Sequence, residues 1–171
     1  SFGKLTGDIS VIKEAISNYA AKCAMKLRKQ NSVCGSINIF LQTNPHKTEH
    51  KQYRPSITLE CETPTNSSPE IIKYALKGLD IVYKEGYLFM KCGIIVNDLC
   101  SENVVQQNMF DTKDRAKENI AMVTMDKINR YVGKDIVRVA VQRFDNRYKL
   151  RADHLSPKYT TRFNEILKVK I

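Results

Sequence analysis

Apolar residues recur at intervals of three and four near the start of the chain, and this spacing predicts a helix from about residue 8 to residue 29. Asp8 or Ser10 can cap its first turn through a side-chain oxygen. A single stripe with this period is typical of a helix that buries one face. The stripe consists of Ile9, Ile12, Ile16, Tyr19, Ala20, Cys23 and Leu27.

The hydrophobic period drops to two over residues 33–42 and again over residues 54–62, which predicts two strands that each have one covered face. A polar stretch, residues 43–53, lies between them. We therefore expect an antiparallel hairpin. The residues on the covered faces are Ile37, Ile39, Leu41, Ile57, Leu59 and Cys61.

A second helix is predicted after the loop 63–70 and runs to about residue 84, with a stripe that includes Ile72, Leu79 and Val82. A strand follows at residues 87–96. With residues 2–6 as a short first strand, the order is β-α-β-β-α-β. This order predicts an α+β fold in which a four-stranded sheet carries both helices on one face.

The other face of the predicted sheet has no helix to cover it. The alternation places Leu88, Met90, Cys92 and Ile94 on the covered face and Tyr87, Phe89, Lys91 and Gly93 on the open one. Phe40 joins the open face. Aromatic and basic side chains on an uncovered sheet are typical of nucleic-acid-binding sheets. Glu60 and Glu62 on the same face weaken that reading, so the pattern alone indicates an interaction surface.

The regular pattern ends near residue 98, and we divide the chain into a domain at 1–98, a connector at 99–112 and a C-terminal region at 113–171. The C-terminal region is predicted to hold a helix over 113–132 and a fifth strand over 136–142. The helix stripe, which we expect to be buried, is Ala116, Ile120, Val123, Thr124, Ile128 and Tyr131.

The charge and the apolar runs of the sequence limit the kinds of partner that the chain can have. The formal net charge is +10, and residues 1–112 hold 13 basic and 11 acidic side chains while residues 113–171 hold 15 and 7. This excess favours a polyanionic partner. No apolar run approaches the about 18 residues that a membrane span needs. Residues 1–4 resemble neither an initiator sequence nor a signal peptide, so we expect a soluble piece of a longer protein.

The five cysteines, Cys23, Cys34, Cys61, Cys92 and Cys100, contain no close pair. We therefore expect free thiols in a reducing cytoplasm and neither a disulfide framework nor a zinc site. His46–His50 reads His-Lys-Thr-Glu-His and matches the His-x-x-Glu-His zinc-protease pattern, in which both histidines lie on a helix. Pro45 and Pro55 bracket this segment, so a solvated loop is the preferred interpretation. We also interpret His154 as a surface or packing residue and expect no bound metal.

The connector contains a short peptide that ends in two adjacent bulky apolar residues: Gln106, Gln107, Asn108, Met109 and Phe110. One interpretation is structural, because Phe110 before the helix start at Asp111 or Thr112 can fold back as a hydrophobic staple. The other is docking in a groove by two apolar anchors, Met109 and Phe110, with Gln106 fixing the register. In this respect the peptide resembles the motif by which bacterial DNA polymerases bind the sliding clamp.

Several segments together resemble one family over nearly the whole chain. They are Ser1–Gly3, Lys26–Arg28, Tyr83–Tyr87, Cys92–Leu99 and Leu155–Phe163. The first four resemble the little finger domain of Y-family translesion DNA polymerases. The last, with its Ser-Pro-Lys-Tyr-Thr-Thr run, resembles the C-terminal signature of the UmuC-like catalytic subunits of bacterial polymerase V. Gln107 stands where the family's clamp motif has leucine, and Phe163 where tryptophan is usual.

The resemblance implies a non-catalytic region of an error-prone polymerase of the SOS response to DNA damage. It would hold primer-template DNA without sequence specificity and bind the sliding clamp, while the full-length protein would be a DNA-directed DNA polymerase. Magnesium would then belong only to the absent catalytic domain. The implied backbone-contacting residues are Ser1, Lys4, Phe89, Lys91 and Gly93, with Lys47, Lys51 and Arg54 in the hairpin.

Further partners implied by the resemblance are UmuD-type accessory subunits and a recombinase filament, in the cytoplasm at the nucleoid. We expect a structural role for the C-terminal signature, because Tyr159 and Phe163 need burial. An alternative from a different class is a standalone RNA-binding α/β module whose sheet stacks single-stranded bases. The two readings differ in the nucleic acid that should bind more tightly.

Overall fold

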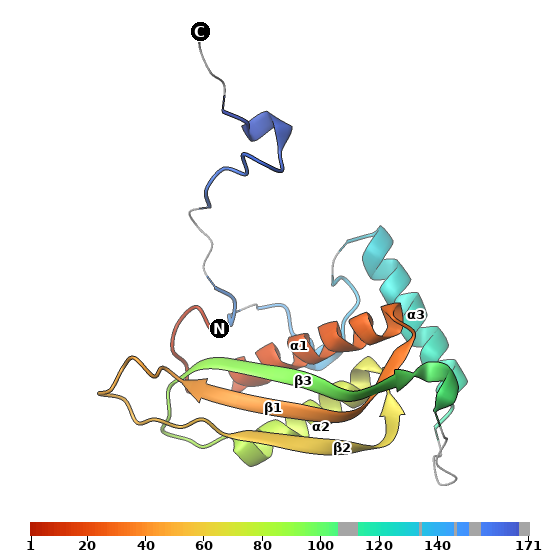
Figure 1. Ribbon diagram of the computed structural model, residues 1–171, viewed down its shortest axis with the longest axis horizontal. Helices are drawn as coiled ribbons and strands as arrows, with labels where there is room; N and C mark the ends of the chain where they lie inside the picture. Colours follow the sequence, from red (N-terminus) through yellow and green to blue (C-terminus); the bar gives the residue numbers. More distant parts are fainter. Residues whose placement is uncertain (106–112, 134, 146, 151–154, 168–171) are drawn as a thin grey trace.

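The computed structural model describes residues 1–105, 113–133, 135–145, 147–150 and 155–167 of the chain (Figure 1). Six regular elements and three short 3-10 turns follow one another along it. The elements are α1 (Ile9–Lys29), β1 (Ser32–Thr43), β2 (Ser56–Thr65), α2 (Ser68–Val82), β3 (Phe89–Ser101) and α3 (Arg115–Tyr131). The 3-10 turns are Glu102–Val104, Ala140–Gln142 and Phe163–Glu165.

The three strands form an antiparallel sheet in the order β2-β1-β3, and α1 and α2 cover one of its faces (Figure 1). The predicted α+β class is confirmed. The predicted fourth strand does not form within the described residues. Residues 2–6 bend at Gly3 and Lys4 and contribute one isolated bridge, between Thr6 and Phe89. Phe2 N–H also donates to the Met90 carbonyl at 2.9 Å, but the bend between these two contacts interrupts the ladder.

Helix α1 begins and ends where its sequence pattern predicts. Asp8 is the N-cap and accepts a hydrogen bond from the Ser10 backbone N–H at 2.8 Å. Ile12, Ile16 and Ala20, at intervals of four, have no exposed surface. The 3.6-residue period therefore places the stripe against the sheet and α2, as expected for a helix with one buried face.

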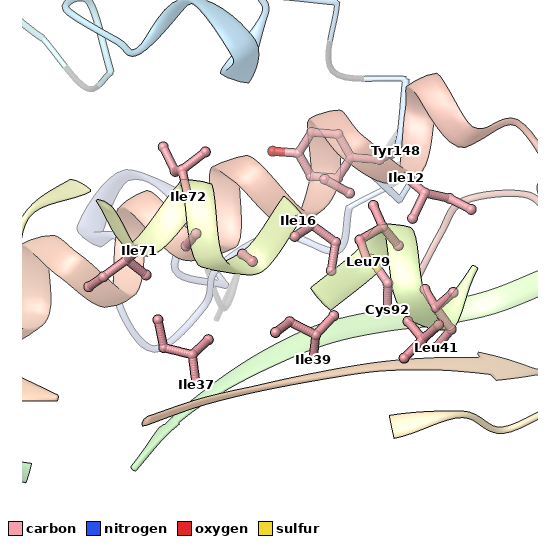
Figure 2. Close-up of a cluster of buried hydrophobic side chains, with 14 of the residues drawn as sticks. Ile12, Ile16, Ile37, Ile39, Leu41, Ile71, Ile72, Leu79, Cys92 and Tyr148 are labelled. Carbon is pink, nitrogen blue, oxygen red and sulfur yellow. The ribbon is translucent and has the colours of Figure 1, made fainter. Parts of the chain in front are cut away.

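The core lies between the two helices and the sheet, where the side chains of both layers point toward each other (Figure 2). Ile37, Ile39 and Leu41 of β1 face the helices and are at most 1% exposed, which confirms the predicted alternation. Tyr148 belongs to the same cluster of buried side chains, lies against Tyr19 of α1 with ring centroids 5.7 Å apart, and is 4% exposed. The C-terminal region therefore contributes a residue to the core of the first domain. The five cysteines are free thiols.

Helix α3 faces this core domain with a mainly polar side that also carries Met122 and Met125, and not with the predicted stripe, which corrects the sequence-based prediction. None of its described residues is buried, and Ile120 and Tyr131 of the predicted stripe are 69% and 83% exposed. The surface it meets includes the start of α2, where Ser67 and Glu70 offer polar groups. Three side chains at helical spacing make polar contacts with it, namely Arg115, Glu118 and Asp126.

The predicted fifth strand is wrong: residues 136–139 form no strand, and Ala140–Gln142 is a 3-10 turn. The Asn129 side chain replaces a neighbouring strand, because its amide accepts from Val137 N–H at 2.8 Å and donates to Val137 C=O at 2.9 Å. Gln142 points inward, and Asn18 Nδ2 donates to its backbone carbonyl at 2.8 Å. Side-chain amides thus form backbone hydrogen bonds that a neighbouring strand would otherwise form.

Residues 155–167 extend away from the sheet and the helices (Figure 1). Phe163 is 95% exposed and Tyr159 is 45% exposed, so the burial expected for these two rings does not occur within the described residues. Among the helices that the structure describes, none combines the length and the apolar character needed to cross a membrane.

Candidate nucleic-acid interface

The open face of the sheet lies opposite α1 and α2 and is built from alternate residues of all three strands. Two of its cross-strand rows, read from β3 through β1 to β2, are Gly93–Phe40–Ser56 and Ile95–Asn38–Thr58. Asn38 donates through Nδ2 to the hydroxyl oxygens of Ser56 and Thr58, both at 2.9 Å. The centre of this face is therefore an ordered polar surface rather than a row of free side chains.

Phe40 covers the backbone of Gly93 on the neighbouring strand. A Cβ added at Gly93 would lie 2.4 Å from Cζ and 2.5 Å from Cε1 of the ring, closer than side chains can approach. An aromatic ring that covers a glycine in the adjacent strand is a known means of fixing strand register. With one side of the ring against Gly93, only its outer side is open to a ligand.

The prediction that Phe89 lies on the open face is wrong, because its side chain is fully buried in the core. A β-bulge at the start of β3 causes the reversal: Gln42 pairs with Lys91 but Thr43 pairs with Phe89, so two residues of β3 advance against one of β1. One extra residue moves a side chain to the opposite face of a sheet. The Phe89 ring packs near three tyrosines at centroid distances of 6.2–6.5 Å, namely Tyr53, Tyr83 and Tyr87.

The charge of the open face changes sign across the sheet. Lys91 is exposed on β3, whereas Glu60 and Glu62 are exposed on β2. A polyanion is therefore attracted to the β3 side and repelled from the β2 edge. Lys91 and Gly93 keep the predicted position on this face, but Phe40 covers Gly93, so Lys91 is the one of the two that is available to a ligand along β3.

The predicted residues Lys47, Lys51 and Arg54 lie in the loop that joins β1 to β2 and projects beyond the end of the sheet (Figure 1). All three are exposed. The loop is organised by Gln52, whose Nε2 donates to the carbonyls of three loop residues at 2.9–3.1 Å; these are Asn44, Lys47 and His50. The loop thus presents its cations from a defined scaffold.

The same turns exclude the zinc-protease arrangement at His46–His50. This segment forms hydrogen-bonded turns, with Lys47 N–H bonded to the Asn44 carbonyl and His50 N–H to the Lys47 carbonyl. The zinc-protease pattern places both histidines on one face of a helix, and this segment contains no helix. Within the described part of the chain, no group of three His, Cys, Asp or Glu side chains is arranged to hold a metal ion.

The N-terminal candidates Ser1 and Lys4 are exposed beside the outer edge of β3. Lys4 lines a hollow of about 430 Å³ together with Arg147 and Lys149 of the C-terminal region. The sequence reasoning missed these last two cations. Its only relevant signal was the excess of basic residues after residue 112, because which of them meet the sheet edge depends on how the C-terminal region packs.

The clamp-like peptide, Gln106–Phe110, lies outside the described residues, but both of its flanks are held. On one side, the Glu102 carboxylate accepts a hydrogen bond from Asn66 Nδ2 at 3.1 Å. On the other side, Lys113 forms an ion pair with Glu70 of α2. These two contacts lie at the end of the sheet where β3 stops and α3 starts.

Glu70 is the electrostatic centre of the second flank. Its carboxylate is 9% exposed and accepts hydrogen bonds from Thr65, Lys113 and Arg115. Burial alone raises the pKa of Glu70, but these three hydrogen bonds outweigh burial and hold the pKa below its ordinary value. The ionised carboxylate therefore fixes the start of α3 against α2.

Comparison with known proteins adds two family matches. The impB/mucB/samB family C-terminal domain matches residues 1–109, and a domain of unknown function (DUF4113) matches residues 121–169. Protein UmuC of Salmonella typhimurium is 34% identical over 99% of this chain and 40% of its own length. Protein MucB of Escherichia coli is 30% identical over 97% of this chain and 39% of its own length.

A more distant relative is named DNA polymerase IV. This protein, from Clostridium acetobutylicum, is 24% identical over 78% of the chain and 32% of its own length. The chain spans about 40% of the length of the first curated relatives that it matches. The matches to UmuC and MucB extend through the sheet, the connector and the C-terminal region alike.

Proposed function

The chain belongs to the impB/mucB/samB family, and from this membership we propose that it is the non-catalytic DNA-holding and clamp-docking region of an SOS-type translesion DNA polymerase. Relatives named UmuC and DNA polymerase IV support this proposal. Polymerisation and its magnesium ions would belong to the part of those relatives that this chain does not match. The role places the protein in the cytoplasm on nucleoid DNA, and UmuD-type subunits and a recombinase filament are its further proposed partners.

The observation that carries the proposal is the placement of exposed cations around one open sheet face. Lys91 lies on that face, the hairpin loop carries Lys47 and Lys51 beyond one end of it, and Lys4 lies at the edge of β3. These side chains can reach phosphates of a duplex that lies along β3. Contacts of this kind position DNA and carry no sequence information. A polymerase that copies damaged templates requires such tolerance.

The test is a fluorescence anisotropy titration of the 171-residue chain with labelled primer-template duplex and with single-stranded RNA of matched length. We expect duplex binding that is independent of sequence and weakens steeply with salt, because phosphate contacts release counterions. The duplex should bind more tightly than the RNA. Equal or tighter binding of the RNA would instead support the RNA-binding module.

The clamp-docking part of the proposal has a separate test. Met109→Ala with Phe110→Ala should remove most of the affinity of the chain for the sliding clamp, because two adjacent apolar anchors supply most of the energy in such peptides. Leu155→Ala with Phe163→Ala is a matched control, since both residues are apolar and strongly exposed. If the first double variant binds the clamp as tightly as the parent, the docking proposal is wrong. Gln107→Leu should strengthen binding by supplying the family's usual apolar residue.

A further inference from the structure

The outward face of α3 is apolar and unpartnered in the described part of the chain. Because the helix uses its polar side to contact the core domain, its stripe turns to solvent, with Ile120 69% exposed and Val123 39% exposed. Because this apolar stripe is exposed, the free energy that its burial would contribute is available for binding a partner. Exposed apolar surface of this kind commonly marks an interaction site.

A groove between α1 and α3 continues this surface. It has a volume of about 690 Å³, and Met25 of α1 and Val123 of α3 are its apolar lining residues. Four exposed basic side chains also line it, namely Lys22, Lys29, Lys127 and Arg130. Within the described residues, none of the four forms an ion pair. The two acidic lining residues are Asp126, which is paired with Arg28, and Asp135, so basic side chains outnumber acidic ones in the lining. The groove therefore combines apolar contact area with positive charge that lacks a partner.

We propose that this groove binds an acidic amphipathic segment of a partner protein. Apolar side chains of such a segment would pack on Met25 and Val123, and its carboxylates would pair with the surrounding cations. This combination is the usual mode in which an amphipathic helix enters a groove, with apolar anchors for affinity and complementary charges for orientation. The site is separate from the open sheet face, so one chain can hold DNA and this partner together.

Two other occupants fit the groove less well. A second copy of the chain carries the same formal charge of +10, and its basic groove would repel this one. Single-stranded nucleic acid is usually held by aromatic rings on which bases stack. None of the residues that line this groove is aromatic. A duplex would use the cations but would leave the exposed stripe of α3 uncovered.

The test uses a fluorescein-labelled peptide of about 20 residues with leucine and glutamate at helical spacing. Its control has the same composition in an order that gives no apolar face. We expect the parent chain to bind the first peptide at least about tenfold more tightly than the second. Amide chemical shift changes in the parent should concentrate on α1 and α3. A single-stranded DNA oligonucleotide should not displace the peptide.

Two variants locate the site. Lys127→Glu with Arg130→Glu, and separately Val123→Asp, should each weaken peptide binding by about tenfold or more. Lys73→Glu with Lys77→Glu makes the same charge change on exposed residues of α2 and should leave it unchanged. Unchanged binding in the groove variants, equal loss in the α2 control, no binding of either peptide, or displacement by the oligonucleotide would overturn the proposal. These results do not depend on whether the sheet binds DNA.

Discussion

Arg28 of α1 and Asp126 of α3 form a bidentate ion pair, with Nε 2.7 Å from Oδ2 and Nη2 2.8 Å from Oδ1. Arg28 also donates through Nη1 to the Asn66 carbonyl at 2.6 Å and to Ser68 Oγ at 3.1 Å. Its side chain is only 5% exposed. One guanidinium thus joins α1, the start of α2 and the otherwise exposed α3.

The first prediction concerns this pair. In a double-mutant cycle of Arg28→Ala and Asp126→Ala, the free energy of unfolding should show a coupling of about 2 kcal/mol, because the pair is shielded from water and doubly hydrogen-bonded. Arg28→Lys should also destabilise, since an ammonium cannot form the fork. Denaturant unfolding curves measure both effects.

The exposed pair between Lys13 and Asp80 is the control for this cycle. Its N–O distance is 3.1 Å, but the two side chains are 41% and 61% exposed. Solvent screening should reduce its coupling below about 1 kcal/mol. Equal couplings for the two pairs would show that Arg28 does not anchor α3.

The second prediction concerns the contact between Phe40 and Gly93. Gly93→Val should lower the free energy of unfolding by about 2 kcal/mol, because any side chain there must displace the ring. Phe40→Ala introduced into the Gly93→Val variant should relieve part of this loss. Ile95→Val, at the next outward position of β3, should cost far less. A freely tolerated Gly93→Val would contradict the close approach.

The third prediction concerns pH and Glu70. The pKa of this carboxyl is lower in the folded chain than its ordinary value of 4.5, so its stabilising contribution is complete above that value and is lost as the pH falls through the folded pKa. At neutral pH, Glu70→Gln should cost about 2 kcal/mol. The difference between parent and variant should shrink as the pH is lowered below 4.5. A difference that stays constant over this range would show that the ionised carboxylate contributes nothing.

The fourth prediction separates Phe89 from Lys91, which the sequence places together on the open face. Phe89→Leu should reduce stability by about 1.5 kcal/mol and leave duplex affinity unchanged, because the ring is in the core. Lys91→Ala should leave stability unchanged and weaken duplex binding. The slope of the logarithm of the binding constant against the logarithm of the salt concentration should fall in magnitude by about 1. Unfolding curves and anisotropy titrations on the same two variants give both readouts. Weaker duplex binding by a stable Phe89→Leu variant would contradict the bulge.

The sequence predicted the secondary structure and its buried face correctly where an element has one strong hydrophobic period and packs on a single core. The stripe of α1 and the alternation of β1 follow directly from side-chain geometry, so Ile12, Ile16, Ile37 and Ile39 are buried as expected. The cap at Asp8 is a local hydrogen bond between neighbours. Such features need no knowledge of the rest of the molecule.

Other features depended on partners that are distant in the sequence. The β-bulge that turns Phe89 inward arises from pairing with β1, and no local signal marks it. The apolar stripe of α3 is real, but its orientation was decided by Arg28 and Glu70, which hold the polar side of the helix. The Asn129 side chain forms hydrogen bonds with both the N–H and the carbonyl of Val137, which take the place of the bonds that a fifth strand would form.

The sequence by itself therefore determined the family, the two buried helices, the hairpin and the excess of basic charge, because these follow from periodicity, local motifs and composition. Only the tertiary structure decided which cations surround the open sheet face and which apolar residues remain outside the core. The physical reason is that a period defines which residues share a face. The energy of burying or pairing that face depends on what the rest of the chain places opposite it.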